Sequence, residues 1–239
     1  MIQEDLISIG EAASILGVSL DTLRRWDKSG KLTSVKSEGG HRRYYRSQVE
    51  LYLNDLFGLA KNWVLLGAEL PSKFYCANSA VFQTRLTRMQ DLLGEVKELA
   101  LIFPLIVAVA GEIGNNSFDH NLGNWPDVPG IFFAYDIHKG SAVLADRGLG
   151  ILTTLKRVKP ELDSDARALK VAFTEIVSGR APENRGNGLK FVRKITAENS
   201  IGLLFQTGNA ELILAKDSSA LDMRVSSEPF RGCLALITF

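Results

Sequence analysis

The chain has 239 residues, 46% of them hydrophobic and 23% charged, and a formal net charge of +1. These values predict an ordinary globular protein of one large or two small domains, and they exclude a basic field over the whole molecule. Cys76 and Cys233 lie far apart without metal-ligand spacing, which predicts a reduced, cytoplasmic protein. The acidic start is unlike a signal peptide, and the most apolar run, 99–110, is short of the roughly 20 residues that span a bilayer.

The first fifty-six residues predict a helix-turn-helix followed by a hairpin. Residues 7–19 predict a short helix and a glycine turn, and 20–28 predict a second helix capped by the preceding serine. β-prone residues flank a Gly-Gly pair within 32–46, which is typical of a hairpin. A third helix is predicted over 47–56.

Positive charge is concentrated on the second helix and the hairpin. Residues 20–46 contain eight Lys/Arg and three Asp/Glu, a local net charge of +5, whereas residues 1–56 contain eight of each sign. These are the elements that would meet DNA, one in the major groove and the other along the backbone or minor groove. The alternative is a charged helix and hairpin with no partner.

This unit resembles the MerR-type winged helix-turn-helix over about residues 5–56. The matching stretches are 9–13, 16–19, 22–26 and 39–44. The Arg-Arg-Trp and Gly-Gly-His-Arg-Arg-Tyr segments are most similar to the subgroup attached to serine transposases and excisionases. Relatives of this type dimerise through a long helix after the unit, and the sequence does not show that helix clearly.

The MerR resemblance implies a set of DNA-contacting residues. On the second helix, residues near base edges or phosphates would be Thr22, Arg24 and Arg25. In the wing, the phosphate-contacting residues would be His41, Arg42, Arg43 and Tyr44. Trp26 either supports the fold or stacks on a sugar.

Residues 57–79 predict a connector that is not a flexible linker, because Gly/Ser/Pro tracts are missing. Apolar residues at near-helical spacing between 56 and 64 predict a docked helix, which could pack on the following domain or on a second copy. Residues 81–93 predict another amphipathic helix, followed by a long helix over 101–120.

The end of that long helix carries Glu112, Asn116 and Asp119 at spacings of four and three. A helix places these side chains along one face. Their oxygen atoms suit a hard cation such as Mg²⁺, and Glu112 could polarise a water. The same spacing also occurs on ordinary solvated helix faces.

Two glycine-containing stretches follow. A hairpin over 131–145 leads to Asp146, and Gly148 and Gly150 then allow close approach to a ligand, although Asp-x-Gly-x-Gly is also a common turn. Residues 151–185 predict a polar insert with a helix over 166–177.

Beyond the insert, the glycines of 186–188 precede a helix over 189–195, an arrangement that holds phosphates. A second hairpin with its turn at 207–209 and a final strand over 233–239 complete the chain.

Residues 80–239 resemble the GHKL ATP-binding fold of type II topoisomerases, ninety-kilodalton heat-shock chaperones, histidine kinases and anti-sigma-factor kinases. The resemblance rests on the 112–119 helix, 146–150 and 186–189, in that order. It implies ATP bound with Mg²⁺ on Asn116, the adenine amine on Asp146, and Glu112 as a general base or metal ligand. The other nucleotide-contacting residues would be Asp119, Gly148, Gly150, Gly186, Gly188 and Lys190.

Three further features qualify this resemblance. Family members often carry a hydroxyl residue after a glycine on the last strand, where this chain has Gly232-Cys233. A histidine-bearing phosphoacceptor helix is not evident, which argues against an ordinary histidine kinase. His120 is similar to a histidine of the small anti-sigma kinases or is a packed residue at a helix end.

The sequence therefore predicts an α+β protein: a winged helix-turn-helix over 1–56, a helical connector over 57–79, and a GHKL-type sandwich over 80–239 with helices on one face of a mixed, mostly antiparallel sheet. The expected function is a homodimeric DNA-binding transcriptional regulator controlled by ATP and Mg²⁺. The alternatives are an ATPase or Ser/Thr kinase acting on an anti-anti-sigma-like partner and targeted by the DNA-binding unit, and a silent GHKL scaffold.

Overall fold

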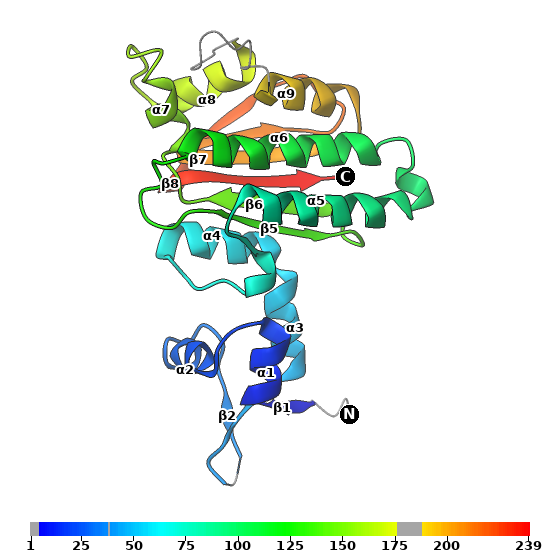
Figure 1. The fold of residues 1–239 in the computed structure, drawn as a ribbon, viewed down its shortest axis with the longest axis vertical. Helices are drawn as coiled ribbons and strands as arrows, with labels where there is room; N and C mark the ends of the chain where they lie inside the picture. The colour runs from blue at the N-terminus through cyan, green and yellow to red at the C-terminus, as the bar shows by residue number, and fades with distance from the viewer. Residues whose placement is uncertain (1–4, 38, 176–187) are drawn as a thin grey trace.

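The computed structural model describes residues 5–37, 39–175 and 188–239. The chain forms a small N-terminal lobe and a larger lobe built on a sheet, joined by a helical stalk (Figure 1). The small lobe and stalk contain β1 (Leu6–Ser8), α1 (Ile9–Leu16), α2 (Leu20–Lys28), β2 (Val35–Lys36), β3 (Arg42–Tyr45), α3 (Arg46–Asn54) and α4 (Leu56–Leu66).

Local chemistry defines the two helices of the helix-turn-helix. Ser8 and Glu11 form a capping box at the start of α1, which satisfies two backbone donors. Gly17 ends α1 at φ 68°, in the left-handed region that glycine adopts without steric cost. Ser19 then caps α2 by accepting the Thr22 amide. The predicted helix-turn-helix and hairpin are confirmed, and β1 adds an unpredicted third strand in the order β1-β3-β2.

The larger lobe is built on one five-stranded sheet with the order β4-β5-β6-β8-β7. Its strands are β4 (Tyr75–Cys76), β5 (Ile131–Asp136), β6 (Ser141–Asp146), β7 (Gly202–Leu214) and β8 (Asp222–Thr238). Its helices are α5 (Ser79–Gly94), α6 (Phe103–Asn121), α7 (Gly150–Leu155), α8 (Asp165–Thr174) and α9 (Gly188–Glu198), with short 3-10 turns at η1 (Ser72–Phe74) and η2 (Lys97–Leu99). Every described strand pair is antiparallel, so the mixed sheet expected from sequence is fully antiparallel in this part of the chain.

Alternating residues of β5 and β6 divide the sheet between two hydrophobic clusters. Phe133 and Leu144 face the main core, which is closed by α5, α6, α8 and α9. Phe132 and Val143 face the opposite side, where α4 packs with Trp63. The predicted sandwich, with helices on one face of the sheet, is confirmed, and the docked helix predicted in the connector covers the second face.

The predicted turn at 207–209 is wrong. β7 runs unbroken through these residues, and the ladder with β8 shifts register on both sides of Gly208. Gly208 has φ 54°, so the glycine forms a bulge within the strand rather than a chain reversal. The insert after Asp146 also begins with α7, which the sequence did not reveal. Within the described ranges, none of the helices is both long and apolar enough to cross a membrane.

Candidate nucleotide pocket and nucleic-acid interface

A cavity of about 760 Å³ lies between α6 and the elements α7, α8 and α9. This volume is within the range of small-molecule sites. The predicted site residues that line it are Glu112, Asn116, Asp119, His120, Asp146, Gly150 and Gly188. The structure therefore brings three separate sequence stretches around one hollow.

Asp146 is the buried carboxylate of this cavity. It ends β6, and only 2% of the residue is exposed. Ser117 Oγ donates to Asp146 Oδ2 at 2.7 Å, and the Gly148 amide donates to Oδ1 at 2.8 Å. Burial raises the pKa of Asp146 to about 6, while the hydrogen bonds from Ser117 and from the backbones of Gly148 and Cys233 lower it. Asp146 is therefore mostly ionised at neutral pH and can accept a further donor from a ligand.

Asn121 holds the loop that carries Gly148 and Gly150 (the glycine loop) against α6. Its Oδ1 accepts the Leu149 amide at 2.8 Å, and its Nδ2 donates to the Ser117 carbonyl at 2.8 Å. A Cβ at Gly148 would lie 2.2 Å from Asn121 Nδ2. The loop can approach the helix this closely only because position 148 has no side chain.

Thr207 holds the far side of the same loop. Its hydroxyl, 1% exposed at the residue level, donates to the Gly232 carbonyl at 2.9 Å and accepts the Ile151 amide at 3.2 Å. Thr207 pairs with Cys233 across the β7–β8 ladder. A hydroxyl is thus present beside position 233, supplied by the neighbouring strand.

Glu112 meets the start of α9. A Cβ on Gly188 would lie 1.7 Å from Glu112 Oε1, so a side chain at position 188 would displace the Glu112 carboxylate from this place. The positive end of a helix dipole favours a carboxylate at such a place. Predicted residue Gly186 lies outside the described residues. Lys190 is not among the cavity-lining residues, and its Nζ donates to the Glu175 carbonyl at 2.6 Å.

The oxygen donors of α6 match the chemistry that Mg²⁺ prefers. Asn116 offers an amide oxygen and Glu112 a carboxylate, both on the cavity wall. In the described ranges, no group of three or more His, Cys, Asp or Glu residues could hold a metal. Mg²⁺ with nucleotide typically takes one or two protein ligands, the remainder being phosphate and water, so this donor set fits that use.

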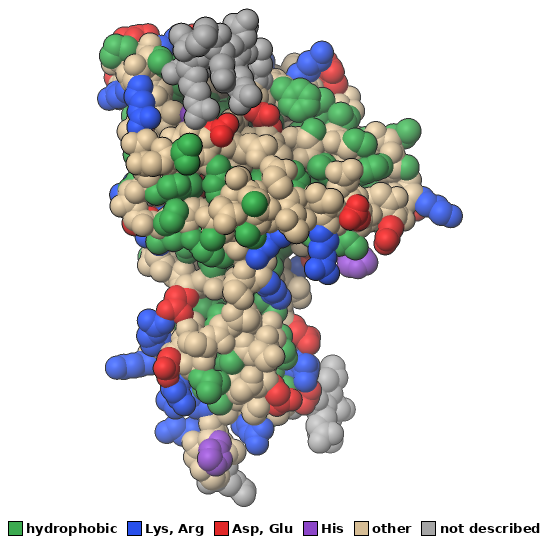
Figure 2. Space-filling view, viewed as in Figure 1, with side chains coloured by type: hydrophobic (Ala, Val, Ile, Leu, Met, Phe, Trp, Pro, Cys, Tyr) green, Lys and Arg blue, Asp and Glu red, His purple; other side chains and the backbone are tan. Residues whose placement is uncertain are grey.

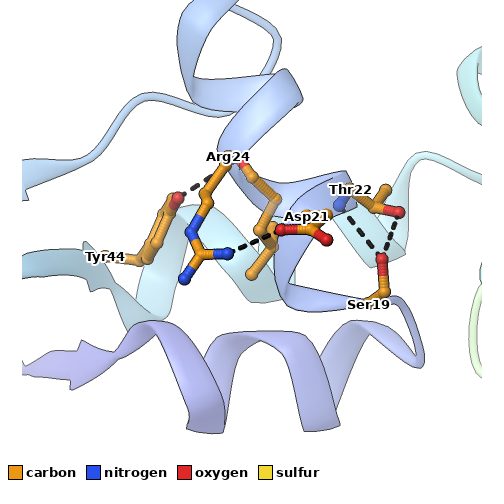
Figure 3. Close-up of polar contacts among 6 residues, drawn as sticks. Ser19, Asp21, Thr22, Arg24 and Tyr44 are labelled. Carbon is orange, nitrogen blue, oxygen red and sulfur yellow. Dashed lines mark hydrogen bonds and ion pairs between the residues drawn. The ribbon is translucent and has the colours of Figure 1, made fainter.

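The predicted DNA-contacting arginines differ in their contacts. Arg24 pairs with Asp21 at 2.6 Å one turn earlier on α2, as Figure 3 shows. Arg25 pairs with Glu69, which lies in the connector. In the wing, Arg42 Nε lies 2.7 Å from Asp27 Oδ2. Basic side chains gather over the small lobe in Figure 2, which agrees with the local charge expected from sequence.

Two predicted DNA contacts are buried. Tyr44 is fully buried, and its hydroxyl faces the Leu23 carbonyl at 3.4 Å (Figure 3), so its expected phosphate contact is wrong and the ring belongs to the core. Thr22 is 3% exposed, and its hydroxyl bonds to Ser19 and Glu69, so it does not face a base edge here. Trp26 is 5% exposed and packs on Tyr52, which favours its core role.

Comparisons with known proteins find a family match in the N-terminal part of the chain. Residues 8–44 match the family model described as MerR family regulatory protein. The helix-turn-helix is MerR-like. A curated relative, the type II methyltransferase M.Eco47II of Escherichia coli, is 46% identical over 48 residues, a match that covers 20% of this chain and 11% of the relative.

Two solved structures are similar over the larger part of the chain. The 43K ATPase domain of Thermus thermophilus gyrase B, in complex with an aminocoumarin, is 15% identical with a TM-score of 0.36, covering 65% of this chain and 40% of that one. The N-terminal domain of a DNA repair protein is 16% identical with a TM-score of 0.32, covering 68% and 42%.

The raised pKa of Asp146 predicts a pH-dependent stability. Between its ordinary value of 3.8 and about 6, the folded protein keeps a proton on Asp146 that the unfolded chain has lost. The contribution of this group to the free energy of unfolding therefore falls as pH rises through that window, by about 3 kcal/mol at 1.36 kcal/mol per pKa unit. Asp146→Asn removes this fall.

Urea unfolding from pH 4 to 7 measures the effect as the difference between the original protein and the variant. Asp91→Asn, on an exposed part of α5, is the control and should follow the original protein. Identical pH profiles for all three proteins would contradict the assignment.

Proposed function

We propose that the chain is a DNA-binding transcriptional regulator whose winged helix is controlled by ATP and Mg²⁺ in the cavity. The nucleotide-binding part of this proposal rests on one observation: the buried Asp146 carboxylate lies beside the glycine loop, in a cavity of about 760 Å³. An ionised carboxylate there accepts a hydrogen bond from the exocyclic amine of adenine. Asn116 would hold Mg²⁺ through its amide oxygen, and Mg²⁺ when bound would neutralise phosphate charge.

The DNA half is supported by the match of residues 8–44 to MerR family regulatory proteins. It is also supported by the charge of +5 over residues 20–46. We assign Arg24 and Arg25 of α2, together with His41, Arg42 and Arg43 of the wing, to DNA. A homodimer would place two such units on a palindromic site, one helical turn or a multiple apart.

Nucleotide binding is tested by calorimetry with ATP and Mg²⁺. Losing a hydrogen bond to a charged group costs about 1.5–3 kcal/mol, so Asp146→Asn should weaken ATP binding by roughly 10- to 150-fold. Because the accepting form of Asp146 is the carboxylate, affinity should also fall as pH drops below about 6. Asp91→Asn is the control. Equal heats for the original protein and Asp146→Asn would contradict the site.

DNA binding is tested by the salt dependence of affinity for a labelled duplex. Arg43→Ala should weaken binding to all sequences and reduce the slope of log K against log salt by about 0.9, as expected when one phosphate contact is lost. Lys61→Ala, which removes the same charge from α4 where Lys61 pairs with Glu228, should leave the slope unchanged. An unchanged slope in Arg43→Ala would remove the wing from the interface.

A second candidate function, ATP hydrolysis or Ser/Thr phosphorylation of an anti-anti-sigma-like partner, is favoured by the position of Glu112. Its carboxylate lies on the cavity wall against Gly188 at the start of α9, where it could polarise an attacking water or hydroxyl. If the protein turns over ATP, Glu112→Gln should retain ATP binding and lower phosphate release at least 100-fold, the usual minimum for losing a general base. If the original protein releases no phosphate, the enzymatic function is contradicted and only the regulator function remains.

A further inference from the structure

The connector contacts the helix-turn-helix between α4 and β4. The Ser72 amide donates to the Gly17 carbonyl at 3.3 Å, and the Ser72 hydroxyl donates to the same carbonyl at 3.4 Å. These bonds fix the connector on the turn between α1 and α2. The segment 67–74 therefore lies against the helix-turn-helix instead of crossing freely between the two lobes (Figure 1).

Glu69, in the same segment, bonds to α2 through both carboxylate oxygens. One oxygen accepts the Thr22 hydroxyl, and the other pairs with Arg25 Nη2. Glu69 thus engages two of the three α2 residues that the MerR resemblance assigns to DNA. A carboxylate and a DNA phosphate are interchangeable partners for a guanidinium group, so they compete for Arg25.

We propose that Glu69 is an intramolecular competitor of DNA, a carboxylate latch that occupies the recognition helix until DNA or a change in the larger lobe displaces it. The latch is reversible, because the side chains of Arg25 and Glu69 are 67% and 46% exposed and exposed ion pairs are weak. Its release requires only that residue 69 move away from α2.

The other end of the segment explains how the pocket could act on the latch, an argument that rests on the proposed function. Arg147 follows Asp146 directly, and its guanidinium lies against Gly67, where a Cβ would be 3.3 Å from Nη1. The same guanidinium lies 5.9 Å from the Trp63 ring of α4 and pairs with Asp127. A shift of the glycine loop on nucleotide binding would therefore be transmitted to the segment that carries Glu69.

The test is the affinity of the full chain for a labelled random-sequence 30-base-pair duplex, compared among Glu69→Gln, the original protein and Glu50→Gln. Glu50 is an exposed residue of α3 in the same lobe, so its substitution controls for the loss of one negative charge. Glu69→Gln should bind DNA about threefold to fivefold tighter than Glu50→Gln, as expected from freeing an exposed ion pair. In an Arg25→Ala background, Glu69→Gln should bring no gain over Glu50→Gln.

Three outcomes would overturn the latch. Equal affinities of Glu69→Gln and Glu50→Gln would show that Glu69 acts only through net charge. Weaker binding by Glu69→Gln would show that Glu69 positions Arg25 for DNA. DNA binding by none of the folded proteins would instead overturn the proposed function, and the latch with it.

Discussion

The cavity depends on the hydrogen bonds that the Asp146 carboxylate accepts where it is buried at the end of the central strand β6. Ser117 binds it from α6 and Gly148 binds it from the following loop. A buried carboxylate is costly unless such donors satisfy it. The sheet, the helix above it and the glycine loop are consequently fixed to one another at this point, and the cavity opens beside it.

Close backbone approach is the second constraint. Gly148 meets the Asn121 amide, and Gly188 meets the Glu112 carboxylate, so closely that a Cβ at either position would displace that side chain. The stretches around Gly148 and Gly188 therefore do more than form turns, because the first brings a loop, and the second a helix start, against a polar side chain of α6. The same side chains then line the cavity, so the packing and the proposed chemistry share their residues.

The sequence predicted the elements whose signal is local. Ser19, Gly17 and the apolar spacing of α5 specify their structures within a turn or two of chain, and each appears as expected. Prediction from the sequence failed where the pairing of distant strands determines the structure. Gly208 and its neighbours are residues typical of a turn, but the ladder with β8 continues past them. The strand order, which leaves one face of the sheet to α4, depends on pairing between distant segments and is not encoded in any single segment.

Among the candidate-site residues, too, those with a local sequence signal were predicted and those that depend on distant contacts were not. Glu112, Asn116 and Asp146 could be selected because acidic and amide groups stand at a helix face and before glycines. Ser117, Asn121 and Thr207 were missed, because a hydroxyl or amide becomes a site residue only through the partner the fold brings to it. Spacing gave one usable signal: Ser117 and Asn121 are four apart on α6, on the face that meets the glycine loop. Tyr44 shows the reverse error, since a residue in a basic run turned inward to the core.

The proposed control of DNA binding by nucleotide is tested most directly by the Kd for one duplex, measured with and without saturating ATP and Mg²⁺. Coupling between two sites is typically about 1–3 kcal/mol, so the proposed control predicts a change in Kd of roughly 5- to 150-fold in the original protein and none in Asp146→Asn. The same Kd in both conditions, with ATP binding verified in the same sample, would contradict it.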